Sequence, residues 1–205
     1  MLTEDRIATT HHRINGWSDR IAYSITRSLR FLADVLFAKR YGNRAIVLET
    51  IAAVPGLVGA AMIHLRCLRW MRHDEGWIRI LMDEAENERM HLMTFIEIAR
   101  PSWFERIMVL IAQALFFTFF LTLYVVSSRT AHRLMGYFEE EAIVSYTRYL
   151  EQIDAGRIDN VPAPDIAIGY WQLAPTAHLR EVVIAVRQDE AGHRDVNHEF
   201  ANRLG

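Results

Sequence analysis

Cysteine is almost absent from this 205-residue sequence, in which Cys67 is the only one. One thiol excludes an internal disulfide framework and any metal site made of cysteines. A strong charge imbalance is also lacking, because the net charge is −2, and no basic run interleaved with aromatic residues predicts nucleic-acid binding. Residues 1–44 nevertheless hold eight Arg/Lys against four Asp/Glu, a local excess that suits an anionic membrane surface.

Segments of alternating β-branched residues are missing as well, while apolar residues recur at helical spacing, so the sequence predicts an all-α protein. The length fits one domain over residues 17–205, after an N-terminal arm over residues 1–16. We expect six helices, near residues 17–38, 44–72, 77–99, 103–128, 130–155 and 175–202, with a loop through Pro162 and Pro164 before the last. Pro55-Gly56 should kink the second helix without ending it.

Two segments favour contact with a membrane. Residues 17–38 form an amphipathic pattern, and Ile107–Val126 is a stretch of 20 residues without a formal charge. A single crossing by Ile107–Val126 would separate helices whose glutamates must meet, as argued below. We therefore expect monotopic association with one leaflet, and a helix buried in a dimer satisfies the same constraint.

Two Glu-x-x-His pairs, Glu88 with His91 and Glu190 with His193, place a carboxylate and an imidazole on one helix face. Chance alone yields about 0.7 such pairs in a chain of this composition, so two pairs are weak signals by themselves. Their neighbours matter more. Glu49 is the only formally charged residue between Arg44 and Arg66, and an unpartnered buried carboxylate there would cost several kcal/mol. A metal cation or an arginine would satisfy it.

A run of three acids, Glu139-Glu140-Glu141, contributes the fourth carboxylate. The face of Glu139 continues through apolar residues and Tyr146, so Glu139 should point into the core. Glu141 shares its face with polar residues and should be solvated, with Glu140 intermediate. The resulting set of four Glu and two His on four helices matches the ligands of dinuclear carboxylate bundles and suits iron or manganese. We also expect Asn87, Asp189 and His132 to orient ligands through hydrogen bonds.

Four segments of the sequence resemble the iron-binding boxes of the alternative oxidase family, the cyanide-resistant ubiquinol oxidases. They are Leu48-Glu49-Thr50, residues 87–92 (NERMHL), residues 136–142 (GYFEEEA) and residues 189–198 (DEAGHRDVNH). The likeness extends over about residues 17–200. It implies a ferritin-like four-helix bundle with a di-iron centre, and two extra hydrophobic or amphipathic helices for monotopic membrane binding.

The resemblance implies roles for individual residues. The ligands of two iron ions, bridged by an oxo or hydroxo group, would be Glu49, Glu88, His91, Glu139, Glu190 and His193. A redox-active tyrosine would be Tyr146. The quinol site would draw on Arg30, Asp34, Arg44, Leu48, Ala142 and Ser145. A supporting network would consist of Asn87, Arg89, His132, Tyr170, Trp171 and Asp189.

The implied reaction is the oxidation of two ubiquinol molecules by O2, giving two quinones and two waters without proton pumping. A homodimer on a membrane surface is implied too. Gly192 stands where the family usually has a second histidine, and residues 1–16 contain no cysteine, so we do not expect regulation through an N-terminal thiol. The sequence shows no secretory segment, so we expect the cytoplasmic face of a bacterial inner membrane, or the mitochondrial inner membrane if the chain is eukaryotic. The alternatives are a quinone-precursor hydroxylase, a plastoquinol oxidase and a non-catalytic ferritin-like iron binder.

Overall fold

The computed structural model describes residues 10–37 and 41–204, and within these ranges the only regular secondary structure longer than a bridge is α-helix. The all-α prediction is confirmed. Residues 1–9 of the predicted arm, residue 38 of the first predicted helix and residue 205 lie outside the described residues. The chain divides into two compact units, one holding α2, α7, α8 and α6 from His132 onward, the other holding the chain from Gly42 to Ala131. The prediction of a single domain stays a prediction.

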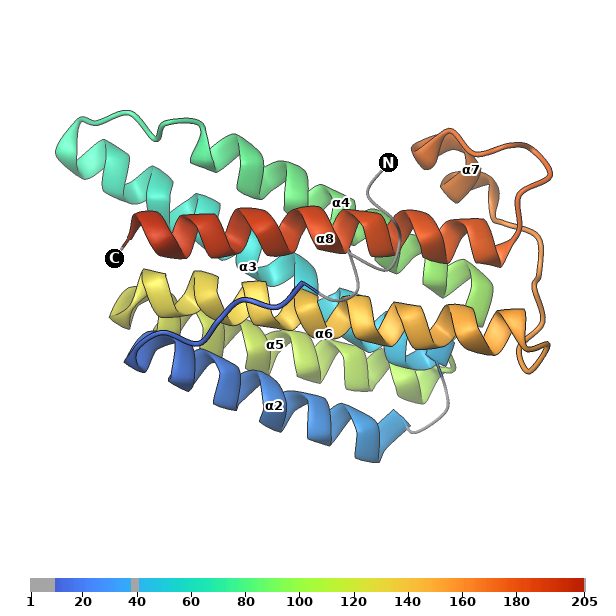
Figure 1. The fold of residues 1–205 in the computed structure, drawn as a ribbon. Helices are drawn as coiled ribbons and strands as arrows, with labels where there is room; N and C mark the ends of the chain where they lie inside the picture. The colour runs from blue at the N-terminus through green and yellow to red at the C-terminus, as the bar shows by residue number, and fades with distance from the viewer. Residues whose placement is uncertain (1–9, 38–40, 205) are drawn as a thin grey trace. The chain divides into compact units, whose positions relative to one another are not determined.

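In the first unit, α6 and α8 run side by side (Figure 1). The helices of this unit are α2 (Trp17–Phe37), α6 (Ser128–Asp154), α7 (Asp165–Trp171) and α8 (Leu179–Arg203). The pairs His132–Asn197 and Thr147–Arg187 are hydrogen bonded, so residue numbers rise along α6 as they fall along α8. The two helices are therefore antiparallel.

The second unit contains α3 (Tyr41–Trp70), α4 (Trp77–Ala99) and α5 (Trp103–Val126). As predicted, α3 continues through Pro55. At Gly56 it meets α4 so closely that a Cβ would lie 2.5 Å from the carbonyl oxygen of Leu81. Only glycine permits this approach, and Gly56 lies two helical turns from Glu49 just as Leu81 lies two turns from Glu88. The close contact thus sets the level at which these two carboxylates face each other.

Local signals delimit the helices of the second unit. The last turn of α4 ends at Arg100, whose φ of 47° is left-handed, directly before Pro101. A capping box then starts α5, since the Ser102 hydroxyl accepts from the Glu105 N–H while the Glu105 carboxylate accepts from the Ser102 N–H. These features explain why both boundaries agree with the sequence pattern.

Two helices, α3 and α5, are long and apolar enough to cross a membrane by length and composition. They differ in burial, because 61% of the most apolar stretch of α3 is buried within the protein, whereas only 17% of the corresponding stretch of α5 is buried. A mostly buried apolar helix is an ordinary core helix, whereas α5 leaves large side chains such as Leu110 and Leu115 exposed. The uncharged stretch Ile107–Val126 therefore forms an apolar surface.

One helix was missed by the sequence pattern. The segment predicted as a loop contains α7, seven residues long, which begins after Pro164 and ends at Gln172 with a left-handed φ of 52°. Its apolar residues are too few for a helical period to stand out. What holds it is tertiary: the Trp171 indole N–H donates to the Asp189 carboxylate on α8 at 2.8 Å.

Candidate metal centre

Three predicted ligands meet in the second unit. The Nδ1 atom of His91 lies 3.2 Å from a carboxylate oxygen of Glu49 and 3.3 Å from one of Glu88. All three side chains are buried, with exposed fractions of 2% or less. Their ligand atoms lie within 4.8 Å of one another, which is close enough for one metal ion to be held among them.

The local sequence explains this arrangement. Glu88 and His91 are three residues apart on α4 and so project from one helix face, as predicted. Glu49 reaches them from α3, whose register against α4 is set by the contact at Gly56. Two carboxylates in an apolar setting are costly to bury, and a divalent cation offsets that cost better than an imidazole alone.

The first unit holds the other three predicted ligands. Glu139 on α6 and Glu190 on α8 are each 1% exposed, and His193 Nδ1 lies 3.7 Å from a carboxylate oxygen of Glu190. The hydrogen bond between His132 and Asn197 lies seven residues, or two turns, from Glu139 along α6 and from Glu190 along α8. Because α6 and α8 are antiparallel, this spacing brings Glu139 and Glu190 to the same level of the helix pair.

His132 and Asn197 form a chain of hydrogen bonds that ends at the backbone of His193. The His132 ring nitrogen Nδ1 and the Asn197 side-chain oxygen are 3.0 Å apart, and the Asn197 amide donates to the His193 carbonyl oxygen at 3.0 Å. Burial lowers the pKa of His132 to about 4, although the hydrogen bond to Asn197 opposes the shift. His132 is therefore neutral near pH 7 and supports the backbone turn that carries His193. The role of Asn197 was not predicted from the sequence.

The pKa of His132 leads to a stability prediction. The neutral ring is favoured in the fold, so stability is complete above the ordinary pKa of 6.5 and is lost as pH falls toward 4. The loss should reach at most about 3 kcal/mol for a shift of this size. Urea unfolding at several pH values should show that His132→Asn removes this part of the pH dependence. His73→Asn, at an exposed position, is the control and should keep the full slope.

The remaining predicted supporting residues lie in different surroundings. Asp189 accepts from Trp171, as noted, and Tyr170 packs edge-on against the Trp171 ring. Asn87 is half-buried on α4. Arg89 is exposed, and its guanidinium donates to the Glu86 carboxylate at 2.7 and 2.8 Å. Their functional roles stay predictions.

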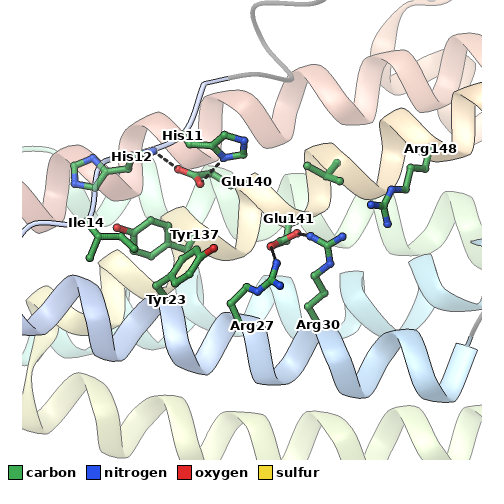
Figure 2. Close-up of a pocket in the computed structure, with 11 residues that line it drawn as sticks. His11, His12, Ile14, Tyr23, Arg27, Arg30, Tyr137, Glu140, Glu141 and Arg148 are labelled. Carbon is green, nitrogen blue, oxygen red and sulfur yellow. Dashed lines mark hydrogen bonds and ion pairs between the residues drawn. The ribbon is translucent and has the colours of Figure 1, made fainter.

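Glu140 and Glu141 differ from the expectation. Glu141 was predicted to be solvated, but its side chain is only 19% exposed and pairs with Arg30 and Arg27 from α2 (Figure 2). Glu140, predicted to be intermediate, is buried at 5%. The prediction for Glu141 was wrong because the helix face it occupies is covered by α2, which a single-helix pattern does not reveal.

Glu140 joins the N-terminal arm to α8. It accepts from the His12 backbone N–H at 2.6 Å, and its carboxylate oxygens lie 3.0 Å from ring nitrogens of His11 and His198. Burial would raise the pKa of Glu140, but the hydrogen bonds from His198, the His12 N–H and His11 lower it overall. This cluster around the buried Glu140 was missed, although the polar residues Arg133, Tyr137 and Glu140 recur on one face of α6.

The residues predicted to bind quinol are divided between the two units. In the first unit, Arg30 contacts Glu141 and lies 3.6 Å from the Asp34 carboxylate, while on α6 Ala142 is buried and Ser145 half-buried. In the second unit, Arg44 is buried and Leu48 half-buried on α3. The predicted redox residue Tyr146 is 3% exposed, two turns beyond Glu139 on α6.

Comparison with known proteins places these residues in context. The sequence model of the family described as "Alternative oxidase" matches residues 3–202. "Ubiquinol oxidase 1a, mitochondrial" of Oryza sativa subsp. japonica is 56% identical over 196 residues, which is 96% of this chain and 59% of the relative. "Ubiquinol oxidase, mitochondrial" of Batrachochytrium dendrobatidis is 56% identical over 194 residues, covering 94% and 61%. "Alternative oxidase 3, mitochondrial" of Glycine max is 52% identical over 196 residues, covering 96% and 60%.

The chain thus spans about three fifths of the length of these relatives. Their names are those of mitochondrial proteins and lend no support to the bacterial inner membrane expected above. The matched region includes both halves of the predicted ligand set.

Proposed function

Because this chain belongs to the alternative oxidase family, we propose that it is a quinol oxidase that transfers electrons from two ubiquinol molecules to O2, forming two quinones and two waters. The observation that carries the proposal is the buried cluster of Glu49, Glu88 and His91. Such a cluster of hard and borderline ligands without thiolate suits iron. The resemblance to the alternative oxidase family further implies an enzyme that does not pump protons.

We propose that the two sets of three residues together hold two iron ions. Glu49, Glu88 and His91 would supply one set, and Glu139, Glu190 and His193 the other. Each set offers two carboxylates and one imidazole, and four carboxylates balance the charge of two divalent ions. When bound, the iron pair supplies the binding and four-electron reduction of O2. His132 and Asn197 would keep the His193 turn in place for this task.

Protein side chains would position the quinol and move its protons. Arg30 is held between Glu141 and Asp34, so its guanidinium has a defined place from which to donate to a quinol oxygen. Arg44, buried on α3, would be a second donor. Tyr146 is buried on the face of α6 that carries Glu139, which suits it to pass an electron and a proton toward the metal pair.

A lipid-soluble substrate requires access to the bilayer. Apolar side chains are exposed on α5 in the second unit and, considered separately, on α2 in the first unit, such as Phe31 and Val35. Each set supports monotopic association with a membrane surface. We propose the mitochondrial inner membrane as the location, on the names of the relatives, and a homodimer as the assembly.

Oxygen uptake by the purified, iron-loaded protein with ubiquinol is the direct test. We expect cyanide-insensitive uptake in which two quinols are consumed per O2, and no uptake by His91→Ala, because the replacement removes the imidazole of the buried cluster. Iron content of both proteins should be measured in parallel. If iron-loaded protein takes up no oxygen with ubiquinol, the oxidase assignment is wrong and a ferritin-like iron binder is favoured.

Product analysis separates the enzymatic alternatives. A quinone-precursor hydroxylase would add an oxygen atom to the ring, which mass spectrometry detects, whereas an oxidase returns the unmodified quinone. A plastoquinol oxidase would prefer plastoquinol to ubiquinol at equal concentration.

A further inference from the structure

A partly open cavity of about 420 Å³ lies within the first unit, between the N-terminal arm, α2 and α6 (Figure 2). Its size falls in the range of small-ligand sites, roughly 300–1,000 Å³. The arm contributes His11, His12 and Ile14 to its walls. None of the cavity's residues except Arg30 belongs to the predicted quinol site, and the metal ligands do not line it.

Basic side chains gather at one end of this cavity. Arg27 and Arg30 of α2 reach toward Glu141, while Arg148 lies further along α6 (Figure 2). Arg30 also pairs with Asp34, and the ion pair of Arg27 with Glu141 is long, at 3.7 Å. Among residues 10–37 and 41–204, Arg148 makes no ion pair within 4.0 Å. At this end three guanidinium groups face two carboxylates, Glu141 and Asp34, and Arg148 is the one without an acidic partner among the described residues.

The third carboxylate near the cavity, Glu140, lies at its other end. Glu140 is engaged by the His12 N–H and lies 3.0 Å from ring nitrogens of His11 and His198. Its carboxylate is turned toward the arm and α8 and away from the guanidinium groups (Figure 2). The arginine end of the cavity is therefore a place for one negative charge.

The neighbouring surface indicates which anion fits. Next to Arg27 and Arg30, α2 exposes Phe31, Leu32 and Val35, with exposed fractions of 71%, 52% and 62%. Arginine side chains beside apolar helix surface bind phosphate groups at the level of lipid headgroups. A phosphodiester carries a single charge, which matches the surplus, whereas a phosphate monoester carries about 1.5 to 2.

We propose that the arginine end of this cavity binds the phosphodiester headgroup of an anionic phospholipid, with the acyl chains along the exposed apolar side of α2. Arg148 and Arg27 donate to the phosphate oxygens, while Arg30 stays paired with Glu141 and Asp34. The proposal rests on the membrane association proposed above. It assigns to α2 a preference for anionic lipid, beyond general attraction to a bilayer.

Native mass spectrometry of the full chain in detergent, titrated with dihexanoyl phosphatidylglycerol or dihexanoyl phosphatidylcholine, tests the site. We expect phosphatidylglycerol to bind more tightly, and Arg148→Gln or Arg27→Gln to weaken its binding about tenfold, the loss of one charge-assisted contact. Arg148→Lys should retain most of the affinity. Arg72→Gln, at an exposed arginine of the other unit, is the matched control and should change nothing. Phosphatidylglycerol binding that is indifferent to both Arg148 and Arg27 would overturn the proposal.

Two further measurements identify the source of the phosphodiester and isolate this proposal from the oxidase function. Glycerophosphoglycerol, the headgroup without chains, should bind far more weakly than the lipid. Equal binding would overturn the lipid assignment in favour of a soluble phosphodiester. Flotation with neutral vesicles reports membrane association, and cyanide-insensitive oxygen uptake reports the oxidase. Both should be retained in Arg148→Gln, so a failed headgroup site is distinguishable from a failed oxidase or a protein that does not bind membranes.

Discussion

Tyr146→Phe should abolish ubiquinol oxidation while leaving the iron content unchanged. The hydroxyl is the only group that the replacement removes, and the proposed role of Tyr146 is to pass an electron and a proton from its buried position two turns beyond Glu139. Loss of such a transfer group lowers turnover by about a hundredfold or more. Steady-state oxygen uptake and iron analysis on the same preparation measure both quantities.

Tyr149→Phe is the matched control for this experiment. Tyr149 is also buried on α6, with an exposed fraction of 4%, and burial raises its pKa to about 12. Tyr149 follows Glu139 by ten residues, which is not a whole number of helical turns, so it does not lie in line with this predicted ligand as Tyr146 does. Its replacement should therefore leave turnover close to that of the original protein. Oxidase activity retained in Tyr146→Phe, or lost equally in both variants, would contradict a specific role for Tyr146.

Gly136→Ala should cause a large loss of stability. A Cβ at Gly136 would lie 2.3 Å from Nδ1 of His198, far inside contact distance. The ring has nowhere to move, because Nδ1 lies 2.9 Å from an Arg133 guanidinium nitrogen and Nε2 lies 3.0 Å from Glu140. We expect the free energy of unfolding to fall by about 2–3 kcal/mol, from overpacking and from strained hydrogen bonds.

A glycine on α8, Gly192, provides the control for Gly136 on α6, because its surroundings are open. Gly192 on α8 is exposed, and a Cβ there would meet nothing within 4 Å. Gly192→Ala should therefore raise the unfolding free energy by up to about 1 kcal/mol, the ordinary gain of alanine over glycine within a helix. Denaturant unfolding of the two variants should give changes of opposite sign. A Gly136→Ala protein as stable as the original would show that α6 and α8 do not pack as closely as the structure indicates.

Much of the helical arrangement was predictable because it depends on local chemistry. Pro101 after α4 and the Ser102–Glu105 capping box of α5 act within one helical turn, so the sequence pattern locates these boundaries. The grouping of Glu88 with His91 is local in the same sense, since a spacing of three puts both on one helix face. The short helix α7 escaped prediction because a contact to Asp189, distant in sequence, holds its last residue.

The environment of the acidic run was decided between helices. One-helix periodicity placed Glu139 in the core, and the structure agrees. The same periodicity assigned Glu141 to solvent, whereas α2 covers that face and brings Arg30 and Arg27 to it. No spacing within α6 contains information about a helix more than a hundred residues earlier in the chain. The Arg148 end of the cavity was hidden from the sequence for the same reason.

The sequence by itself thus identified Glu49 and the two Glu-x-x-His pairs as candidate metal ligands. Side-chain spacing placed each pair on one helix face, and the cost of burying a charge in an apolar helix singled out Glu49. Tertiary structure decided which partners those side chains meet. The close contact at Gly56 brings Glu49 level with Glu88 and His91, and the His132–Asn197 pair brings Glu139 level with Glu190. The physical reason is that helix periodicity specifies the face on which a residue lies, while only packing between helices specifies the level at which two faces meet.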